Sequence, residues 1–421
     1  MTGKFSPAKD YKFGILYRLT PTGKVYAKDA KMEEDGSFKL NLDSTIAKGS
    51  YRLVYNLPEE DHYFDLIYDG KEEISFTFSE DSGVQFSDSQ NKILSEYLNE
   101  INTVEKKIDS ELDEDNPNKT KLEKLFGKQA EIQKEAEIKS QNTFAYVFIN
   151  AHKPYIPGSF KNRGIYFGSK KDSFFNNFDF ENEELQSSSF PLKMIEAYYD
   201  DFVTKQGGSF YRSIINDIHF EIRNCDANFQ KNLLADFWQS LVDKNKKTAA
   251  NYLAESYLIE LAASVNDTSL SEKLDLFKNL SIGATAPNFS WVEENNKERT
   301  LYTNQGAAYY VLAFWSTGCS HCMEQMPVFH EKMRNLNSQK IEVIAIGLEM
   351  EDQPWKDSIT QLSGFTHVLR TDEDRMDITK RYDVTATPTY FVLDKDKKII
   401  GRPRGQKNLS RIIDTLEAYD K

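Results

Sequence analysis

Two cysteines separated by two residues are the part of this sequence best suited to chemistry. Cys319 and Cys322 form a C-x-x-C pair directly after the apolar run at residues 309–314. A thiol at the N-terminus of a helix has a lowered pKa, because unsatisfied backbone N–H groups stabilise the thiolate. The second sulfur lies one helical turn further on, where it can attack a mixed disulfide formed by the first. We therefore expect a redox-active dithiol in which Cys319 attacks and Cys322 resolves, with no organic cofactor or metal.

The residues on both sides of the pair predict an α/β core that positions it. The expected elements, in order, are a strand at 307–314, a helix at 320–336, a strand at 341–346, a further helix, strands at 390–393 and 399–400 around a turn at 394–398, and a closing helix at 409–419. Strands that alternate with helices indicate a parallel sheet, and the last two strands indicate an antiparallel hairpin at its end.

Several short motifs accompany the dithiol: Ala-Pro-Asn-Phe at 286–289, Phe-Trp at 314–315, Pro327, and Thr387-Pro388. With these motifs, residues 281–421 resemble the thioredoxin fold, and within it the TlpA/ResA-like branch of the bacterial cell envelope. It implies that Pro388 is a cis-proline lying against the dithiol and that the backbone of Thr387 pairs with the substrate. It also implies a thiol–disulfide oxidoreductase that acts on protein dithiols or disulfides and that receives electrons from a membrane or periplasmic donor.

The chain departs from this family near the dithiol. Many members carry a tryptophan immediately before the first cysteine, where this chain has Gly318, so access to the sulfur is expected to be easier. The family usually places a carboxylate on the preceding strand, or six residues after the first cysteine, to take the proton of the second thiol. Those positions hold Ala313 and Gln325. Glu324 is a substitute that we expect to be exposed.

Two residues give conflicting indications of the redox potential. His321, immediately before the second cysteine, resembles oxidising DsbA-type proteins, in which a cationic imidazole stabilises the thiolate. The alternative is a solvent-exposed helix residue with little effect. Thr387, before the proline, resembles the reducing branch. We expect a potential between about −270 and −120 mV, the range that such proteins span.

Other uses of a C-x-x-C pair find less support. A zinc site needs further ligands, but the third cysteine, Cys225, lies far upstream, and the sequence has no second C-x-x-C and no H-x-x-x-H. A peroxiredoxin needs a proline and a threonine at fixed places that residues 315–318 do not supply. A copper chaperone could use both cysteines and His367, although that family spaces its cysteines one residue further apart. Cys225 is expected to be a buried or lone thiol, with a resolving role as the alternative.

Length and charge limit the class of protein. The 421 residues predict roughly three domains. The formal charge of −13 and a pI near 5.2 argue against a nucleic-acid partner, because no basic stripe is available to neutralise phosphates. No apolar run is long enough to predict a membrane span, and the first residues lack the apolar core of a signal peptide. We expect that a signal sequence and a first strand precede them naturally, and that the protein is periplasmic or anchored in the envelope.

Two further modules are expected before the redox domain. Residues 1–87 alternate apolar and polar residues between turn signals, which predicts an antiparallel β-sandwich-like module. At 88–280 apolar residues recur with a helical period, which predicts a mainly α-helical module that begins with a helical hairpin and includes helices at 191–204, 209–223 and 229–263. The aromatic-rich stretch 155–190 is expected to be a loop, either packed on the helices or facing a substrate. The thioredoxin-like redox domain occupies 281–421.

The sequence therefore predicts a multidomain enzyme that exchanges disulfides with envelope proteins through Cys319 and Cys322. The two front modules would select the partner or form a homodimer. The alternative is an envelope binding protein whose thioredoxin-like domain is a weakly active scaffold, which the missing carboxylates at positions 313 and 325 would allow.

Overall fold

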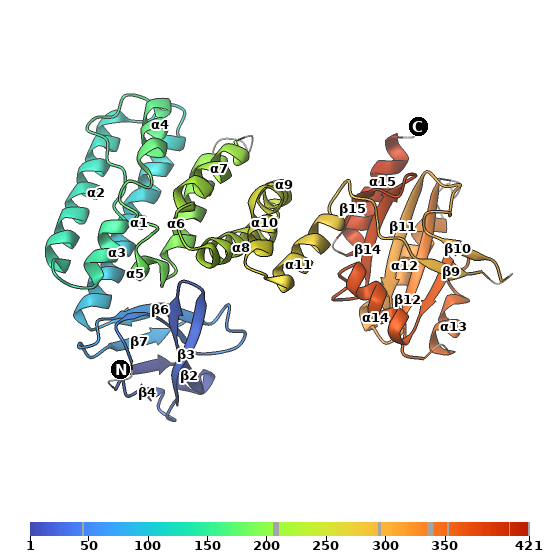
Figure 1. The fold of residues 1–421 in the computed structure, drawn as a ribbon, viewed down its shortest axis with the longest axis horizontal. Helices are drawn as coiled ribbons and strands as arrows, with labels where there is room; N and C mark the ends of the chain where they lie inside the picture. Colours follow the sequence, from blue (N-terminus) through green and yellow to red (C-terminus); the bar gives the residue numbers. More distant parts are fainter. Residues whose placement is uncertain are drawn as a thin grey trace. The chain divides into compact units, whose positions relative to one another are not determined.

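The computed structural model describes residues 1–43, 46–204, 210–293, 296–334, 340–351, 353–403 and 405–419. The chain divides into two compact units, Met1–Asn266 and Asp267–Lys421 (Figure 1). The first unit contains a β-rich region followed by helices, and the second contains an α/β sheet, which confirms the expected fold classes. The division at 87/88 and 280/281 stays a prediction. The last strand of the β-rich region ends at Phe86, and α11 (Thr268–Asn279) belongs to the second unit.

Two four-stranded sheets form the β-rich region. Their strands are β1 (Thr2–Ser6), β2 (Phe13–Thr20), β3 (Gly23–Lys31), β4 (Ser37–Lys39), β5 (Gly49–Val54), β6 (Tyr63–Tyr68), β7 (Ser75–Ser79) and β8 (Gly83–Phe86). One sheet has the order β4-β1-β7-β8 and the other β3-β2-β5-β6. The expectation of an antiparallel module is wrong for one pair, because β1 and β7 are parallel; all other neighbouring strands in the two sheets are antiparallel. Apolar residues at alternate positions place Phe5, Tyr55 and Phe78 in one shared aromatic core, with the rings of Tyr55 and Phe78 4.4 Å apart. Burial of these rings is the main force that holds the sheets together.

A helical hairpin opens the rest of the first unit. Its helices are α1 (Ser89–Asp113) and α2 (Lys119–Ser140), followed by α3 (Ala145–Ala151), α4 (Arg163–Ser173), α5 (Glu183–Gln186), α6 (Phe190–Tyr199), a π-helical turn (Asp200–Thr204), α7 (Tyr211–Ile222), α8 (Ala227–Asp243), α9 (Lys247–Leu253), a second π-helical turn (Ala254–Leu258) and α10 (Ile259–Ser264). The side chain of Asp88 caps α1 by accepting from the N–H of Asn91 at 2.9 Å. Asn118 caps α2 in the same way, at 3.0 Å from the nitrogen of Lys121.

Asn91 joins the first helix to the second sheet. Its Oδ1 accepts from the backbone N–H of Ile67, and its Nδ2 donates to the carbonyl oxygen of the same residue, both at 2.8 Å. Ile67 lies on β6, at the edge of its sheet. Asn91 is only 3% exposed, so its amide would be costly to bury without these partners. The two bonds therefore fix the start of α1 on the β-rich region.

Two stretches of the first unit differ from expectation. The helix expected over 229–263 is interrupted between α8 and α9, because Asn245 has a φ of 57°, in the left-handed region that ends helices. The stretch 155–190, expected as a loop, contains α4 and the short α5. Within it Phe178 and Phe180 are 5% and 4% exposed, so these two rings are packed in the interior.

One five-stranded sheet forms the centre of the second unit, in the order β13-β12-β11-β14-β15. Its strands are β11 (Tyr309–Trp315), β12 (Ile341–Leu348), β13 (Thr366–Arg370), β14 (Thr389–Asp394) and β15 (Ile399–Gly401); a separate hairpin has β9 (Ser290–Val292) and β10 (Glu298–Thr300), and the helices after α11 are α12 (Ser320–Arg334), α13 (Gln353–Ile359), α14 (Asp372–Arg381) and α15 (Gln406–Tyr419). Strands β11, β12 and β13 are parallel, and β14 and β15 are antiparallel, as expected for all but β13. The sequence did not reveal β13, because its alternation of polar and apolar residues extends over only five residues.

The alternating residues of β11 build a core on each face of this sheet. Val311, Ala313 and Trp315 pack with residues of α12, α13 and α15. Leu312 and Phe314 face the opposite way and pack with residues of α14. The sheet is therefore covered by helices on both faces, which is why β11 and β12 read as nearly continuous apolar runs.

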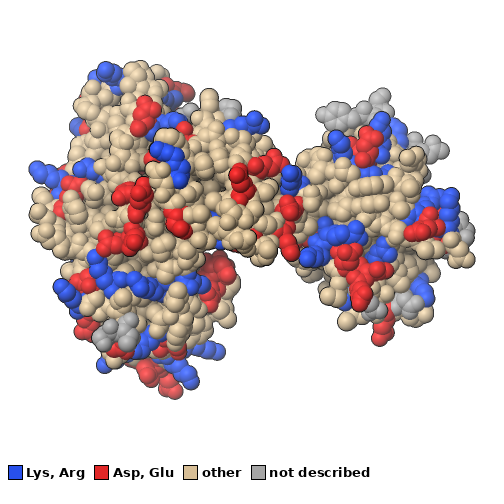
Figure 2. Space-filling model, in the orientation of Figure 1, with Lys and Arg blue, Asp and Glu red and all other residues tan. Residues whose placement is uncertain are grey.

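Charged side chains of both signs are spread over the face of the molecule that Figure 2 shows. On the face shown in Figure 2, Lys and Arg are interspersed with Asp and Glu within each unit, so the formal charge of −13 is not gathered into one area there. Among the described residues, no helix combines the length and the apolar character that crossing a bilayer requires.

Candidate active site

The strand–loop–helix order places Cys319 at the start of α12. The backbone N–H of Cys319 donates to the carbonyl oxygen of Ser316 at 3.2 Å, and the N–H of Met323 donates to the carbonyl oxygen of Cys319 at 3.1 Å. Cys319 is therefore the residue from which the first turn of the helix starts, close to N–H groups that have no partner within the helix. Cys322 follows inside the helix. It is completely buried, in the core that also contains Trp315, Phe329 and Tyr390.

The dithiol lies against the segment that precedes β14. The Sγ of Cys319 donates to the carbonyl oxygen of Thr387 at 3.1 Å and accepts from the N–H of Cys322 at 3.4 Å. The peptide bond between Thr387 and Pro388 is cis. Five residues were expected to form the site, and the structure brings four of them together. These four are Cys319, Cys322, Thr387 and Pro388, and the fifth is His321.

The two thiols have opposite pKa shifts. Partial burial by itself raises the pKa of Cys319, but hydrogen bonds with the side chains of Thr387 and Cys322 and with the backbone N–H groups of Cys322 and His321 outweigh it, so this pKa lies below the ordinary value of 9.0. Burial raises the pKa of Cys322 to about 12, and the hydrogen bond with Cys319 adds to the rise. Near neutral pH Cys319 is therefore the nucleophile of the pair, and Cys322 is a protonated thiol that does not react until it loses its proton.

Alkylation of the reduced protein should show this asymmetry. At pH 7 a thiol with a pKa near 12 is ionised to about 10⁻⁵, whereas one below 9 is ionised to about 10⁻² or more. The ratio of the two thiolate fractions is therefore about 1000. The more basic thiolate of Cys322 is intrinsically a better nucleophile, which reduces the expected ratio of the two rates by about 20-fold. We expect iodoacetamide to modify Cys319 at least about 50-fold faster than Cys322, measured by mass spectrometry of timed digests. Because the pKa of Cys319 is lowered from 9.0, its rate should rise with pH and reach half of its plateau value below pH 9. Faster labelling of Cys322 would contradict the assignment.

His321 contributes to the thiolate through its backbone, while its side chain is exposed at the start of α12. The imidazole of His321 is therefore solvent-exposed, as the alternative interpretation from the sequence expected. The effect of this imidazole on the redox potential stays a prediction.

His321→Ala is expected to make the protein a slightly weaker oxidant. The substitution keeps the backbone N–H and removes only an exposed imidazole, whose solvent-screened interaction with the thiolate is worth less than about 1 kcal/mol. Equilibration with glutathione should show a shift of up to about 20 mV toward a more negative potential. A shift toward a more positive potential would contradict a thiolate-stabilising imidazole.

The two positions where the family usually carries a carboxylate hold side chains that cannot ionise. Ala313 is completely buried on β11. Gln325, one turn after Cys322, is partly buried, and its Oε1 has no hydrogen-bond partner among the described residues. Glu324 is exposed, as expected. Neither position therefore supplies a buried base to Cys322.

Glu349 is a buried carboxylate that the sequence analysis missed. It lies just after β12, is 5% exposed, and accepts hydrogen bonds from the N–H of Thr317 at 2.6 Å, the Thr317 hydroxyl at 3.0 Å and the Ser316 hydroxyl at 3.3 Å. These bonds hold the loop that carries Cys319. The parallel register pairs Trp315 with Gly347, which brings the residues two positions further along both strands side by side. Pairing the two predicted strands in this register would have placed Glu349 beside Thr317 from the sequence.

Glu349→Gln should loosen this loop. An amide can accept through one atom only, so at least one of the two Thr317 donors loses its partner, at a cost of about 1–3 kcal/mol. We expect the urea midpoint of the second unit to fall accordingly in circular dichroism. Glu351→Gln, at an exposed position nearby, is the control and should leave the midpoint unchanged. Equal midpoints for both variants would show that Glu349 does not hold the loop.

Tyr390 is a second residue that the sequence analysis did not single out. It pairs with Ala313 across β14 and β11, is 1% exposed, and its hydroxyl has no hydrogen-bond partner among the described residues. Burial raises its pKa, and the negative charges of Cys322 and Cys319 raise it further. The phenol therefore stays protonated near the dithiol and can act there as a donor but not as a base.

Two other residues named from the sequence lie away from the dithiol. Cys225 is 9% exposed in the first unit, its thiol donates to the carbonyl oxygen of Phe180 at 3.3 Å, and burial raises its pKa to about 11. His367 lies on β13, with its Nε2 3.0 Å from the carbonyl oxygen of Leu362. Within the described parts of the chain, no three His, Cys, Asp or Glu side chains gather as metal ligands.

A surface cleft gives access to the nucleophile. It has a volume of about 600 Å³ and is lined by the loop around Cys319, the end of β12 with Glu349, and the segment up to Thr387. Met350, 79% exposed, lies at its edge. A polypeptide segment could therefore reach the Cys319 sulfur along this cleft.

Comparisons with known proteins place this geometry in a class. Residues 306–399 match the family model of thioredoxin-like domains. The thiol-disulfide oxidoreductase ResA of Bacillus cereus is 27% identical over 160 residues, which cover 38% of this chain and 91% of the relative. ResA of Bacillus subtilis is 25% identical over 171 residues, 41% of this chain and 94% of the relative. A solved thioredoxin domain of a thiol-disulfide oxidoreductase from Bacteroides vulgatus is 20% identical, with a TM-score of 0.30, covering 33% of this chain and 99% of that one.

The second unit is therefore a thioredoxin-like domain. The protein is a thiol–disulfide oxidoreductase, homologous in this part to the ResA proteins.

Proposed function

We propose that this enzyme exchanges disulfides with other proteins of the bacterial cell envelope through Cys319 and Cys322. The observation that carries the proposal is the contrast between the two thiols. Cys319 is partly exposed at a cleft with a lowered pKa, whereas Cys322 is buried with a pKa raised to about 12. Such a pair suits a first cysteine that reacts with the partner and a second that reacts only with the first.

The exchange needs two successive displacements. The Cys319 thiolate attacks one sulfur of a partner disulfide, forming a mixed disulfide and releasing the other partner sulfur as a thiolate. Cys322 then loses its proton and attacks Sγ of Cys319, which releases the second partner thiolate and leaves a Cys319–Cys322 disulfide. Two electrons pass to the partner, and a dithiol donor in the membrane or periplasm restores the reduced enzyme. In the reverse direction the same steps oxidise a partner dithiol.

The residues opposite the dithiol fit the docking of a partner. The carbonyl oxygen of Thr387 lies 3.1 Å from the attacking sulfur, and Thr385 and Ala386 before it are exposed. An extended segment of the partner, paired with the backbone of Thr387 beside Pro388, would place its disulfide next to Cys319. The envelope location and the electron donor rest on the resemblance to TlpA/ResA-like proteins, and the homodimer remains an expectation from the sequence.

Covalent trapping tests the proposal. Purified Cys322→Ala, which cannot resolve a mixed disulfide, should accumulate covalent partners from an envelope extract of the host bacterium, which mass spectrometry identifies. The matched control carries Cys319→Ser as well and should capture none. Capture that does not depend on Cys319, or capture of cytosolic proteins alone, would refute the proposed partners.

A further inference from the structure

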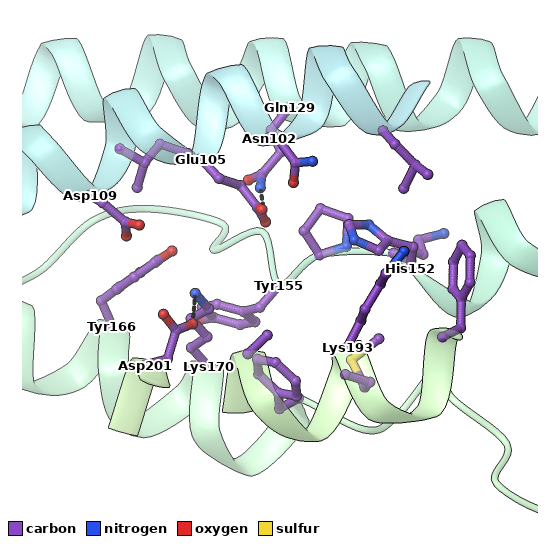
Figure 3. Close-up of a pocket in the computed structure, with 18 residues that line it drawn as sticks. Asn102, Glu105, Asp109, Gln129, His152, Tyr155, Tyr166, Lys170, Lys193 and Asp201 are labelled. Atoms are coloured by element: carbon purple, nitrogen blue, oxygen red, sulfur yellow. Dashed lines mark hydrogen bonds and ion pairs between the residues drawn. The ribbon is translucent and has the colours of Figure 1, made fainter. Parts of the chain in front are cut away.

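A cavity of about 440 Å³ lies in the first unit, among helices α1, α2, α4 and α6 (Figure 3). Lys170 and Asp201 of its wall pair with each other at 2.5 Å. Two atoms of the wall, Oε1 of Gln129 and Nδ1 of His152, have no hydrogen-bond partner among the described residues, but both are buried beneath the surface of the cavity. A ligand in the cavity would not reach them, so the cavity alone does not specify a ligand.

A buried hydroxyl without a partner also lies in the core of the second unit, close to reacting atoms. Tyr390 is 1% exposed, and its phenol oxygen has no hydrogen-bond partner among the described residues. An unpaired buried donor is costly, and a phenylalanine would fill the same space without that cost. Departures of this kind are expected mainly at functional sites. The hydroxyl therefore calls for a partner that is absent while both thiols are protonated.

The sheet and α12 hold the ring of Tyr390 in the same core as Cys322. Tyr390 pairs with Ala313 across β14 and β11, and the small side chain of Ala313 leaves room for the ring on that face of the sheet. The ring packs against Phe329, with the two ring centroids 5.7 Å apart. Phe329 lies two turns after Cys322 on the buried face of α12. The strand thus brings a phenol to the helix face that carries the second thiol.

The sulfur of Cys322 is the acceptor that this phenol can serve. Burial raises the pKa of Tyr390 most, and the negative charges of Cys322 and then of Cys319 raise it further, so the phenol keeps the proton that it would donate. The indole N–H groups of Trp315 and Trp355 are also buried in this core without a partner among the described residues. That of Trp355 lies directly on Gly347 of β12. Trp315 therefore has the only indole that needs a separate test.

We propose that Tyr390 takes part in the disulfide exchange, because its hydroxyl donates a hydrogen bond to the sulfur of Cys322 while that sulfur is a thiolate. A thiol and a disulfide sulfur are weak acceptors, whereas a thiolate is a strong one. The bond therefore forms only in the reacting state. The proton stays on the phenol oxygen throughout, and the proton of Cys322 goes to water. This inference rests on the two displacements proposed above.

The hydrogen bond would accelerate the exchange in both directions. When Cys322 attacks the mixed disulfide, the donor raises its thiolate fraction about tenfold or more, which is the usual worth of one hydrogen bond to a charged group. A less basic thiolate is a weaker nucleophile, so the net gain in rate is about threefold or more. When a thiolate attacks the Cys319–Cys322 disulfide instead, Cys322 leaves, and a stabilised thiolate leaves faster. An interaction made only in the reacting state lowers the barrier without stabilising either end state.

The two-step reaction of the full chain with the chromogenic aryl disulfide DTNB tests this role. Parent and variants carry Cys225→Ser, so that only the dithiol reacts. Cys319 forms a mixed disulfide and releases a first equivalent of coloured aryl thiolate, and Cys322 then displaces the second. In stopped flow near pH 7, Tyr390→Phe should lower the rate of the second release relative to the first by about threefold or more.

The equilibrium potential separates this role from a merely structural one. Reduction of the Cys319–Cys322 disulfide by dithiothreitol should slow in Tyr390→Phe by a factor similar to that for the second release. The potential of the variant against glutathione should therefore remain that of the parent. A structural disturbance would instead favour one redox state and shift the potential, which would contradict the inference.

Tyr11→Phe is the matched control, because Tyr11 is 4% exposed in the first unit and its hydroxyl is also buried without a partner among the described residues. It should release both equivalents at the parent rates. The urea midpoint of Tyr390→Phe should not fall, since the substitution removes an unpaired donor. Equal rate ratios in folded Tyr390→Phe and the parent, or a slower second release in Trp315→Phe alone, would overturn the inference. A parent that releases no second equivalent would overturn the exchange itself, and the inference with it.

Discussion

Cys319→Ser is expected to lower the rate of insulin disulfide reduction by about 10³-fold or more, to the level of dithiothreitol alone. A serine hydroxyl is not ionised near neutral pH and cannot form the mixed disulfide, so the first displacement is lost. The side chains are similar in size, and Cys319 is only partly buried, so the fold should persist. The measurement is the turbidity of precipitating insulin chains, with the enzyme at catalytic concentration.

Cys225→Ser is the matched control for this experiment. Cys225 is buried in the first unit, and the pKa of its thiol is raised to about 11, so it should not take part in exchange at neutral pH. The variant should therefore reduce insulin at the parent rate. Loss of activity in the control would give Cys225 the resolving role considered as an alternative. A parent protein that fails to reduce insulin would instead favour the weakly active scaffold.

Gln325→Glu is expected to accelerate the release of a mixed disulfide about 10²-fold near pH 7. Release requires Cys322 to lose its proton, and burial holds that pKa near 12. In the parent the rate should therefore rise about tenfold per pH unit throughout the neutral range, because the small thiolate fraction does so. A carboxylate one turn along α12 would accept the proton directly, and general-base assistance of this kind typically gives about 10²-fold or more.

The release rate can be followed by stopped flow between about pH 6 and 9. The variant should show a much flatter pH profile than the parent, with the largest difference at the acidic end. Glu324→Gln is the control, because Glu324 is exposed and should contribute little. Coinciding profiles for Gln325→Glu and the parent would mean that another base already serves Cys322. A slower Glu324→Gln would identify that base.

The sequence was sufficient for the features that depend on local spacing. The C-x-x-C pair, the apolar run before it and the Thr-Pro dipeptide lie in short stretches whose residue types predict a strand, a helix start and a partner segment. These expectations place Cys319 and Cys322 on the elements that the structure shows. The helical hairpin of the first unit could likewise be predicted, because its apolar residues recur with a regular helical period.

The parts that sequence reasoning missed depend on pairing between distant strands. Glu349 lies 32 residues beyond Thr317, and only the parallel register of β11 and β12 brings the two together. Tyr390 approaches the dithiol for the same reason, through its antiparallel pairing with Ala313. The cavity of the first unit needs four helices to meet, and part of its wall comes from a stretch whose aromatic composition suggested a loop. Composition does not specify such pairings.

The bonds between Asn91 and Ile67 also bear on the solubility of the β-rich region. Strand β6 is the last in its sheet, and an unpaired edge strand offers its N–H and C=O groups to any extended chain. The amide of Asn91 occupies one such pair, as the backbone of a neighbouring strand would. Where the helix begins, the sheet is thus prevented from adding another strand. Asn91, in the first turn of α1, thereby also protects the folded protein against edge-to-edge aggregation.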